Sequence, residues 1–350
     1  MTTATMQLAS ESPLISILIP IRNEATYIER CLDAVLGQDY PAERLEILIA
    51  DGLSDDGTRE ILHRYEEFYA QIKVYENPSK IVPTGLNILI HNSRGEILIR
   101  VDGHTIIQRD YVRNCVELLL HSKADNVGGR MNTIGESNFE QVVAYVTSSP
   151  FGVGGARFHY SEREEYVDTV YMGAWKRDIF KKLGLFDEEM IRNQDDEFNY
   201  RLREFGGKVL LSPKIKSFYY PRGSITKLWK QYFQYGFFKV RVLQKHPAQM
   251  RPRQFIPFAF VLTLLISVLL TIFTPWGWIP LALLSALYLF ANLTASLWVA
   301  VKAGWRFLPM LPLAFATLHL SYGLGFLVGL LRFWNRWRDK DGRVPKGAND

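Results

Sequence analysis

Cysteine is nearly absent from this chain: Cys31 and Cys115 are the only two among 350 residues. Both fall in predicted helices far apart in the sequence, which argues against a disulfide framework and fits a reducing compartment. Residues 1–13 lack the basic and then apolar segments of a signal peptide, and we predict that they are disordered. The soluble part that follows is therefore expected to stay in the cytoplasm.

Also missing is a Gly-x-Gly-x-x-Gly motif after the first predicted strand, which disfavours a dinucleotide-dependent oxidoreductase. The formal net charge is +5, yet much of the excess basic charge lies beside apolar spans, and the loops with candidate functional residues are acidic. Basic residues next to membrane spans face anionic lipid, which explains the charge better than a nucleic-acid groove. We therefore expect no nucleic-acid partner.

Long apolar runs, by contrast, fill the last hundred residues, whereas residues 1–250 have the composition of a soluble α/β protein. The segments 255–273, 279–301 and 308–331 are each long enough to cross a membrane, which takes about 20 apolar residues. The segment 225–243 interleaves aromatic and basic side chains, so it is predicted to be a helix that lies on the bilayer surface. An ordinary packing helix is the alternative there.

The charges between these segments predict their sides of the membrane. The link 274–277 is uncharged and aromatic, as expected on the far side, and Lys302 and Arg306 return the next loop to the cytoplasmic side. A third full crossing would then place the basic tail, residues 332–343, outside, against the positive-inside rule. Either the third segment is re-entrant or the rule fails, and the sequence leaves this open.

Before the apolar runs, β-branched strands alternate with amphipathic helices. Buried strands are predicted at 15–19, 45–50, 72–75 and 96–101, and helices at 24–36, 58–69, 83–92 and 110–121. This alternation predicts a doubly wound α/β fold with a parallel sheet, in which ligands bind at the carboxyl ends of the strands. Asp51 and Asp102 both fall at such ends.

The pattern after residue 126 is less regular. It predicts a mobile glycine-rich loop at 151–156 and a helix at 195–204 that starts beside a plausible set of acids. Like the earlier helix with Thr58 as its expected N-cap, this one follows a polar loop. We divide the chain into an N-terminus (1–13), an α/β domain (14–223), an interfacial helix and linker (224–253), about three transmembrane segments (254–332) and a basic tail (333–350).

Four clusters of polar residues at strand ends and at a helix start carry candidate chemistry. They are Pro20, Arg22 and Glu24; Asp51 with the loop to Thr58; Asp102 and His104; and Asp195 and Asp196. A strand-end carboxylate can bind a nucleoside, and a carboxylate with an imidazole can hold a divalent cation that neutralises a diphosphate. An acid at a helix start can take a proton from an acceptor hydroxyl. Each cluster alone also fits an ordinary turn, helix cap or solvated loop.

Taken in order, these segments resemble the family-2 inverting glycosyltransferases of the GT-A fold. The resemblance rests on residues 17–24, Ile-Leu-Ile-Pro-Ile-Arg-Asn-Glu, and on residues 50–58, Ala-Asp-Gly-Leu-Ser-Asp-Asp-Gly-Thr. Over roughly residues 14–245 the chain is similar to bacterial succinoglycan-type exopolysaccharide glycosyltransferases. The resemblance implies a mixed GT-A sheet, a UDP-sugar donor and Mg²⁺ or Mn²⁺ as cofactor.

On the donor side, the resemblance implies a nucleotide-sugar site made by Pro20, Arg22, Glu24, Asp51 and Asp102. Asp51 would contact the uridine base. Asp102 and His104 would hold the metal, although the family usually carries Asp-x-Asp and the third position here is His104. Because imidazole is a softer ligand than carboxylate, this departure favours manganese over magnesium.

On the acceptor side, the resemblance implies that Gly173 and Ala174 border the acceptor pocket. When Arg201 is aligned with the arginine that the family carries on this helix, Asp195 matches the general base. A slip of one residue would choose Asp196 instead. The Gln-x-x-Arg-Trp motif of processive synthases is absent after residue 225, which favours the addition of a single sugar.

The sequence thus predicts a metal-dependent inverting hexosyltransferase that moves one sugar from a UDP-sugar to a saccharide on polyprenyl diphosphate. The product would serve exopolysaccharide or cell-surface glycan synthesis. We expect a multi-pass protein of a bacterial-type plasma membrane with its catalytic domain in the cytoplasm. Two alternatives stay open: transfer to polyprenyl phosphate itself, and a non-catalytic nucleotide-binding membrane scaffold.

Overall fold

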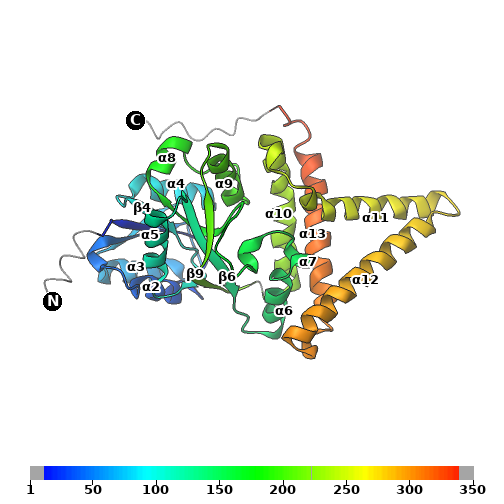
Figure 1. Ribbon diagram of the computed structural model, residues 1–350, viewed down its shortest axis with the longest axis horizontal. Helices are drawn as coiled ribbons and strands as arrows, with labels where there is room; N and C mark the ends of the chain where they lie inside the picture. Colours follow the sequence, from blue (N-terminus) through cyan, green and yellow to red (C-terminus); the bar gives the residue numbers. More distant parts are fainter. Residues whose placement is uncertain (1–11, 222, 339–350) are drawn as a thin grey trace. The chain divides into compact units, whose positions relative to one another are not determined.

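The computed structural model describes residues 12–221 and 223–338, and its contacts divide the chain into two units (Figure 1). The first unit contains the described residues up to 132 and residues 161–219. The second contains residues 133–160 and the described residues from 220 onward. The sequence placed a boundary at residue 223, whereas the contacts also group the segment 133–160 with the C-terminal helices. The predicted disordered N-terminus and most of the basic tail lie outside the described residues.

The first unit is built on one mixed sheet with the strand order β3-β2-β1-β4-β8-β6-β9-β5. The strands β1 (Ile15–Ile21), β2 (Leu45–Asp51), β3 (Ile72–Glu76) and β4 (Ile97–Arg100) are parallel, as the sequence predicts. The strand β8 (Tyr171–Lys176) runs antiparallel to β4 and to β6 (Asn126–Thr133), and β9 (Val209–Tyr219) pairs antiparallel with β5 (Thr105–Ile107) and β7 (Glu165–Tyr166). The sheet is therefore parallel in its first half and mixed as a whole.

Helices flank this sheet because their apolar faces have the spacing that buries them against it. They are α2 (Ile28–Leu36), α3 (Thr58–Phe68), α4 (Val82–Asn92), α5 (Tyr111–His121), α8 (Asp178–Leu183) and α9 (Gln194–Glu204) (Figure 1). Every residue of β1 and β2 is buried, so these two strands lie entirely within the core.

Two predicted helix starts differ from the structure. Helix α2 begins at Ile28 and not at Glu24, because residues 24–27 form a turn in which the Glu24 carbonyl accepts from the backbone N–H groups of Tyr27 and Ile28. Thr58 is the first residue of α3 and not its N-cap, which is Gly57 in a left-handed conformation. The Asp56 carboxylate caps this helix by accepting from the Thr58 backbone N–H at 3.1 Å.

The second unit is helical. It contains α6 (Asn138–Thr147), α7 (Pro150–Val153), α10 (Ile225–Lys245), α11 (Ile256–Phe273), α12 (Trp278–Ala303) and α13 (Leu311–Arg332). Short 3₁₀ turns lie at Arg157–His159, Pro247–Gln249, Pro252–Phe255 and Trp305–Phe307, and another, Ala42–Arg44, belongs to the first unit. Three helical stretches, Pro252–Phe273, Trp278–Ala303 and Leu311–Arg332, are long and apolar enough to cross a membrane.

The glycine-rich segment that was predicted to be a mobile loop begins as the short helix α7. Its N-terminus is capped because the Ser149 hydroxyl accepts from the Gly152 backbone N–H at 3.1 Å. The Phe151 carbonyl is bound in turn by His319 of α13. These hydrogen bonds give the segment a defined conformation that its glycine content alone did not indicate.

Candidate active site

The parallel half of the sheet brings the ends of β1 and β2 together. Ile21 and Asp51 are register partners, so Pro20 and Arg22 lie beside the start of the loop that follows β2. The Asp51 side chain is buried, and its carboxylate accepts from the Ser54 hydroxyl at 2.5 Å and from the Ser54 backbone N–H. Arg59 of α3 places its Nε 3.7 Å from the same carboxylate. Asp51 is thus fixed in place where a nucleoside could approach it.

The loops after β1 and β2 hold each other through side-chain hydrogen bonds. The Asn23 amide donates to Asp55 at 2.9 Å, and the Asp55 backbone N–H donates back to the Asn23 side chain at 3.1 Å. The Ser54 hydroxyl accepts from the Asn23 backbone N–H at 2.8 Å, and the Arg22 side chain lies over Gly52. This reciprocal pairing fixes the backbone between the predicted nucleotide-binding residues.

A second contact joins the first strand's loop to the end of β4. The His104 Nδ1 atom lies 2.9 Å from the Glu24 Oε1 atom, and both side chains are less than one-fifth exposed. Gly103 permits this approach, because a Cβ atom there would lie 2.6 Å from the Ile21 Cγ2 atom. When Nδ1–H donates to the carboxylate, Nε2 is the unprotonated nitrogen, which is the form in which histidine binds metals. Glu24 therefore holds the His104 ring in an orientation that a metal ligand at this position would need.

The side chains that could act as ligands fit a divalent cation that also binds a diphosphate. Among residues 12–221 and 223–338, no three His, Cys, Asp or Glu side chains form a metal cluster. Asp102 and His104 supply one carboxylate and one imidazole, and a six-coordinate Mg²⁺ or Mn²⁺ would take its other ligands from donor oxygens and water. Such a cation commonly binds through one or two protein groups together with substrate phosphates.

Arg100 connects the candidate metal ligand with the candidate base. Its side chain is only 6% exposed; Nε donates to the Asp102 Oδ1 atom at 2.8 Å, and Nη1 donates to the Asp195 carboxylate. Burial alone would raise the pKa of Asp102, but Arg100 and His104 outweigh it and hold this pKa below its ordinary value. Burial raises the pKa of Asp195 above its ordinary value, although Arg100 opposes the shift.

Sequence reasoning missed Arg100 as a functional residue. The available signal was a single cation inside the apolar run 97–101, because a buried arginine is rarely tolerated without a carboxylate partner. The structure supplies two such partners, from the end of β4 and from the first turn of α9.

The acids at the start of α9 have different surroundings. Asp195 contacts Arg100 and is 28% exposed, so it remains accessible to a substrate. Glu197 is buried and binds Arg201 through two hydrogen bonds of 2.7 and 2.9 Å, while Arg201 also donates to the carbonyl of Leu183. The helix arginine therefore has a structural role. The geometry favours Asp195 over Asp196 as the base, and the choice stays a prediction.

The predicted acceptor-side pair lies in the middle of β8. A Cβ atom at Gly173 would lie 2.3 Å from the Trp175 ring, so the strand is crowded there. Ala174 is fully buried and pairs in the sheet with Ile99 on one side and with Val127 on the other. The strand's contact with the metal-site loop comes from Met172, whose sulfur accepts from the Asp102 backbone N–H at 3.2 Å. Met172 was not identified from the sequence.

Backbone strain gathers around the same residues. Four non-glycine residues with positive φ, Asn23 (57°), Leu53 (54°), Met172 (47°) and Asn193 (64°), each lie within two positions of a candidate site residue. Non-glycine residues in this region cost of order 1–3 kcal/mol, and they persist where the surrounding structure fixes them, commonly at functional sites. The strain and the hydrogen bonds thus mark the same set of loops.

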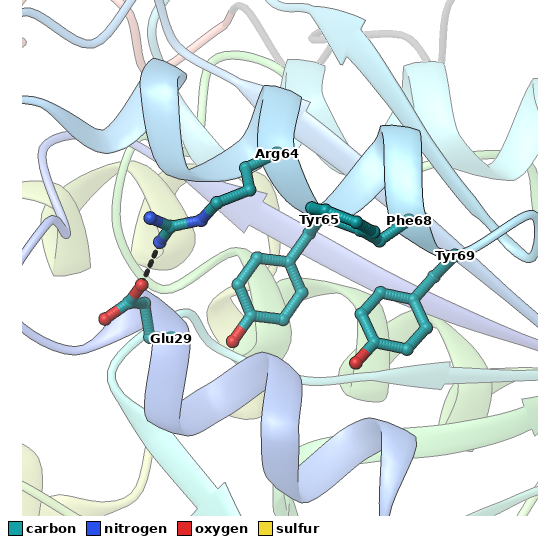
Figure 2. A pocket seen from close by; sticks show the side chains of 5 residues that line it. All are labelled: Glu29, Arg64, Tyr65, Phe68 and Tyr69. Carbon is teal, nitrogen blue, oxygen red and sulfur yellow. Dashed lines mark hydrogen bonds and ion pairs between the residues drawn. The ribbon is translucent and has the colours of Figure 1, made fainter.

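A separate surface pocket lies between α2 and α3, away from these residues (Figure 2). Arg64 pairs there with Glu29, and the rings of Tyr65 and Tyr69 stack with centroids 5.7 Å apart. None of the candidate site residues lines it. The chemistry of the chain is therefore assigned to the strand ends and not to this pocket.

Comparison with known proteins agrees with this arrangement. The family described as Glycosyl transferase family 2 matches residues 16–184. Succinoglycan biosynthesis protein ExoA of Rhizobium meliloti (strain 1021) is 31% identical over 332 residues, which cover 94% of this chain and 98% of that protein. The dolichyl N-acetyl-alpha-D-glucosaminyl phosphate 3-beta-D-2,3-diacetamido-2,3-dideoxy-beta-D-glucuronosyltransferase of Methanococcus voltae is also 31% identical, over 91% of this chain and 97% of its own length.

Solved structures share the architecture. Mannosyltransferase PcManGT from Pyrobaculum calidifontis, solved with GDP-Man and Mn²⁺, matches with a TM-score of 0.59 at 19% identity, covering 91% of this chain and 88% of that one. S. aureus TarS 1-349 in complex with UDP-GlcNAc matches with a TM-score of 0.52 at 16% identity, covering 95% and 97%. These likenesses establish the fold, which is the GT-A fold that the sequence predicted. Together with two relatives that match almost end to end, they show that this chain belongs to glycosyltransferase family 2.

Proposed function

We propose that this glycosyltransferase is membrane-bound and inverting, and that it moves one hexose from a UDP-sugar to a saccharide carried on polyprenyl diphosphate. The observation that carries the proposal is the meeting of Asp102 and Asp195 at Arg100, since it places a diphosphate-site acid beside an acid that can act as a base. The product would enter exopolysaccharide or cell-surface glycan synthesis, as the name of the Rhizobium relative supports.

The donor binds along the ends of β1, β2 and β4. Asp51 accepts from the uridine base, and Pro20, Arg22 and Glu24 line the nucleotide beside it. Asp102 and His104 hold Mg²⁺ or Mn²⁺, which when bound supplies positive charge for the departing diphosphate. The solved neighbour that contains Mn²⁺ supports this cofactor class for the fold.

In the reaction, the Asp195 carboxylate accepts the proton of an acceptor hydroxyl. The hydroxyl oxygen then forms a bond to the anomeric carbon, while the bond from that carbon to the diphosphate oxygen breaks and UDP leaves. Attack occurs on the face opposite the leaving group, so the configuration inverts and no covalent enzyme intermediate is needed. The carboxylate must lie within hydrogen-bond reach of the hydroxyl, at about 2.6–3.2 Å.

The acceptor approaches β8, where Gly173 and Ala174 border its pocket. The name of the Methanococcus relative describes transfer to a sugar already linked to dolichyl phosphate, which supports a lipid-linked saccharide as the acceptor class. The apolar helices of the second unit keep the enzyme at the membrane that contains such lipids. We place the protein in a bacterial-type plasma membrane, multi-pass, with the catalytic domain in the cytoplasm.

The test is the Asp195→Asn variant, assayed with labelled nucleotide sugars and lipid extraction of the products. We expect transfer to fall by at least about 10³-fold while UDP binding is retained, because amide nitrogen cannot accept the proton. The matched control is Asp196→Asn, which should keep most activity. If Asp196→Asn loses transfer and Asp195→Asn does not, the base assignment moves by one residue.

Product analysis distinguishes the other functions. Labelled sugar on a lipid without any earlier sugar would show transfer to polyprenyl phosphate itself. Tight UDP binding without turnover of any donor would show a nucleotide-binding scaffold. Sugar added to a lipid-linked saccharide, one residue per acceptor, is the outcome that the proposal requires.

A further inference from the structure

Helix α13 packs along α10 over almost its whole length. A Cβ atom at Gly325 would lie 2.0 Å from the Phe233 carbonyl oxygen, and one at Gly329 would lie 2.6 Å from that of Phe237. Farther along, the Gln244 amide donates to the Phe333 carbonyl at 2.7 Å. Contacts advance together along both sequences, so the two helices run parallel, and glycines let their backbones approach closely.

The composition of α10 prevents it from crossing a bilayer. It carries five cations between its first and last turns: Lys227, Lys230, Lys239, Arg241 and Lys245. Each such residue near the middle of a membrane helix costs about 2.5–3.5 kcal/mol on insertion scales. Because α13 follows this helix turn by turn, α13 cannot cross the membrane without taking α10 with it.

Chain connections keep the start of α13 on the side of the first unit. Only four residues separate β6 from α6, and Val142 and Val146 of α6 pack in one cluster with Leu311 and Phe315 of α13. Four linking residues span roughly 17 Å at full extension, which is too short to cross a hydrocarbon core about 30 Å thick. The N-terminal end of α13 is therefore tied to the same side of the membrane as the catalytic domain.

Helices α11 and α12 differ from α13 in how much protein covers them. In the most apolar stretch of each helix, 11% of the residues of α11 and 22% of those of α12 are buried, against 50% for α13. Figure 1 shows them projecting from the α10–α13 pair and meeting at the turn 274–277. The contacts of α11 with α13 come from its first turns, where Phe258 lies against Phe326 and a Cβ at Gly323 would meet the Pro257 carbonyl. Helix α12 also contacts α13, where the Asn292 amide donates to the Pro312 carbonyl at 3.0 Å, while much of the rest of the hairpin surface is apolar and exposed.

Charge along the hairpin follows the same division. Arg251 and Arg253 precede α11, Lys302 lies in the last turn of α12 and Arg306 follows that helix, so the chain is basic at both ends of the hairpin. The turn between them has no charge, and Trp276 beside it is 73% exposed. The helical stretches Pro252–Phe273 and Trp278–Ala303, of 22 and 26 residues, are about 33 and 39 Å long, enough to reach across the hydrocarbon core. Basic residues at the cytoplasmic ends of the hairpin and an aromatic turn at the far interface match the rules for membrane hairpins.

We propose that only the α11–α12 hairpin crosses the bilayer, while α13 lies with α10 along the cytoplasmic membrane surface. The chain then crosses twice, and residues 333–338 stay on the side of the catalytic domain. This topology removes the conflict between a third crossing and the basic charge that follows α13. The proposed topology does not depend on which reaction the enzyme catalyses, because its test measures the accessibility of cysteine residues and not turnover.

Cysteine labelling of the full chain in cells tests this topology. Glu67→Cys, Thr274→Cys and Asn335→Cys place a thiol on the exposed surface of α3, at the hairpin turn and after α13, at positions that are all exposed. The native Cys31 and Cys115 are buried, so they give little background, which the parent chain measures. A membrane-impermeant maleimide is applied to intact and to permeabilised cells, and each labelled band is compared with total protein.

The proposal requires residue 335 to label with the same sidedness as residue 67, and residue 274 with the opposite sidedness. Three crossings would instead place residues 274 and 335 together, opposite residue 67. A hairpin that does not cross would give all three positions the same sidedness. Either of these results overturns the proposal, and equal amounts of the three variants in washed membranes confirm that insertion itself is intact.

Discussion

Arg100 gives the site a fixed cation that does not come from the substrate. Its guanidinium group is almost entirely buried and contacts two carboxylates, Asp102 on the metal-site loop and Asp195 on α9. A guanidinium group is planar and presents its donors in a rigid fork, so it can hold two acids at a set separation. We infer that Arg100 positions the base relative to the diphosphate site and does not itself react.

Replacing Arg100 separates positioning from binding. We expect Arg100→Met to lower kcat by at least about 100-fold, because Asp195 loses its partner and about 2.7 kcal/mol of transition-state stabilisation corresponds to that factor. Arg100→Lys should recover part of kcat, since one ammonium can replace the charge but not the fork. Steady-state kinetics measure both, with donor binding to check folding. A purely structural role would lower the amount of folded enzyme and leave its kcat unchanged.

Glu24 offers a second residue-scale prediction. Its carboxylate accepts from His104, so Glu24→Gln should weaken orientation of the imidazole and reduce Mn²⁺ affinity by about 10–100-fold, as losses of such partners usually do. The measurement is the Mn²⁺ concentration that half-saturates UDP binding in calorimetry. Glu29→Gln, on the exposed surface of α2, is the matched control and should keep the wild-type value. Weaker UDP binding at unchanged Mn²⁺ affinity would instead indicate that Glu24 contacts the nucleotide.

For single residues, the sequence indicated which side chains could carry chemistry better than it indicated which residues they contact. Asp51, Asp102 and Asp195 could be named as candidates because carboxylates at strand ends and helix starts are visible in a sequence. Arg100 and Met172 were not, because their roles come from contacts with residues 70 to 95 positions away. Such contacts depend on the order of strands in the sheet, which alternating patterns do not encode.

At the scale of elements, Glu46 fastens the amino end of the parallel strands. The side chain is buried, and its carboxylate accepts from the Ser16 hydroxyl, from the Arg94 backbone N–H and from Arg94 Nε at 2.9 Å. Burial alone would raise the pKa of Glu46, but the hydrogen bonds from Ser16 and Arg94 outweigh it and lower this pKa. Three segments, β1, β2 and the turn before β4, are thereby joined at the edge opposite the site.

This lowered pKa makes a prediction about stability and pH. A depressed folded pKa contributes stability above the unfolded value of about 4.3, and the contribution is lost as the pH falls through the folded pKa. Glu46→Gln should therefore lower the free energy of unfolding by about 1–3 kcal/mol at pH 7, with a smaller difference below pH 4. Thermal unfolding of the detergent-solubilised protein at both pH values measures this. Glu43→Gln, which is exposed nearby, should change neither value; a pH-independent loss would show that packing and not charge is responsible.

Helices and strands were predicted closely wherever the apolar residues followed a single helical or strand spacing. The four parallel strands and the helices between them lie within a few residues of their predicted positions, since apolar spacing decides them. The antiparallel half was less visible, because β5 has three residues and β7 has two. Helix starts shifted where side chains of neighbouring loops, such as Asp56, provide the capping groups.

At the scale of the whole molecule, the apolar segments were identified correctly but not their environments. Hydropathy treats α12 and α13 alike, with a mean value of 1.6 for each, yet their burial differs more than twofold. The distinguishing signal is the group Gly323, Gly325 and Gly329, because small residues at such spacing allow close helix packing. What packs against them, the charged helix α10, lies about ninety residues earlier and could not be inferred from the spacing.

The same reasoning predicts where charge can be tolerated. Leu265 lies at the middle of α11 and is 41% exposed to the surroundings of the hairpin, whereas Ile256 is 65% exposed at its first residue, beside Arg253. Leu265→Arg should prevent insertion, since an arginine at the centre of a crossing costs about 2.5–3.5 kcal/mol, and Ile256→Arg should not, because its side chain reaches the basic interface. The share of protein that stays in membranes after an alkaline wash measures the difference. Equal retention of the two variants would mean that α11 lies outside the hydrocarbon core, and the hairpin would then rest on the surface like α10.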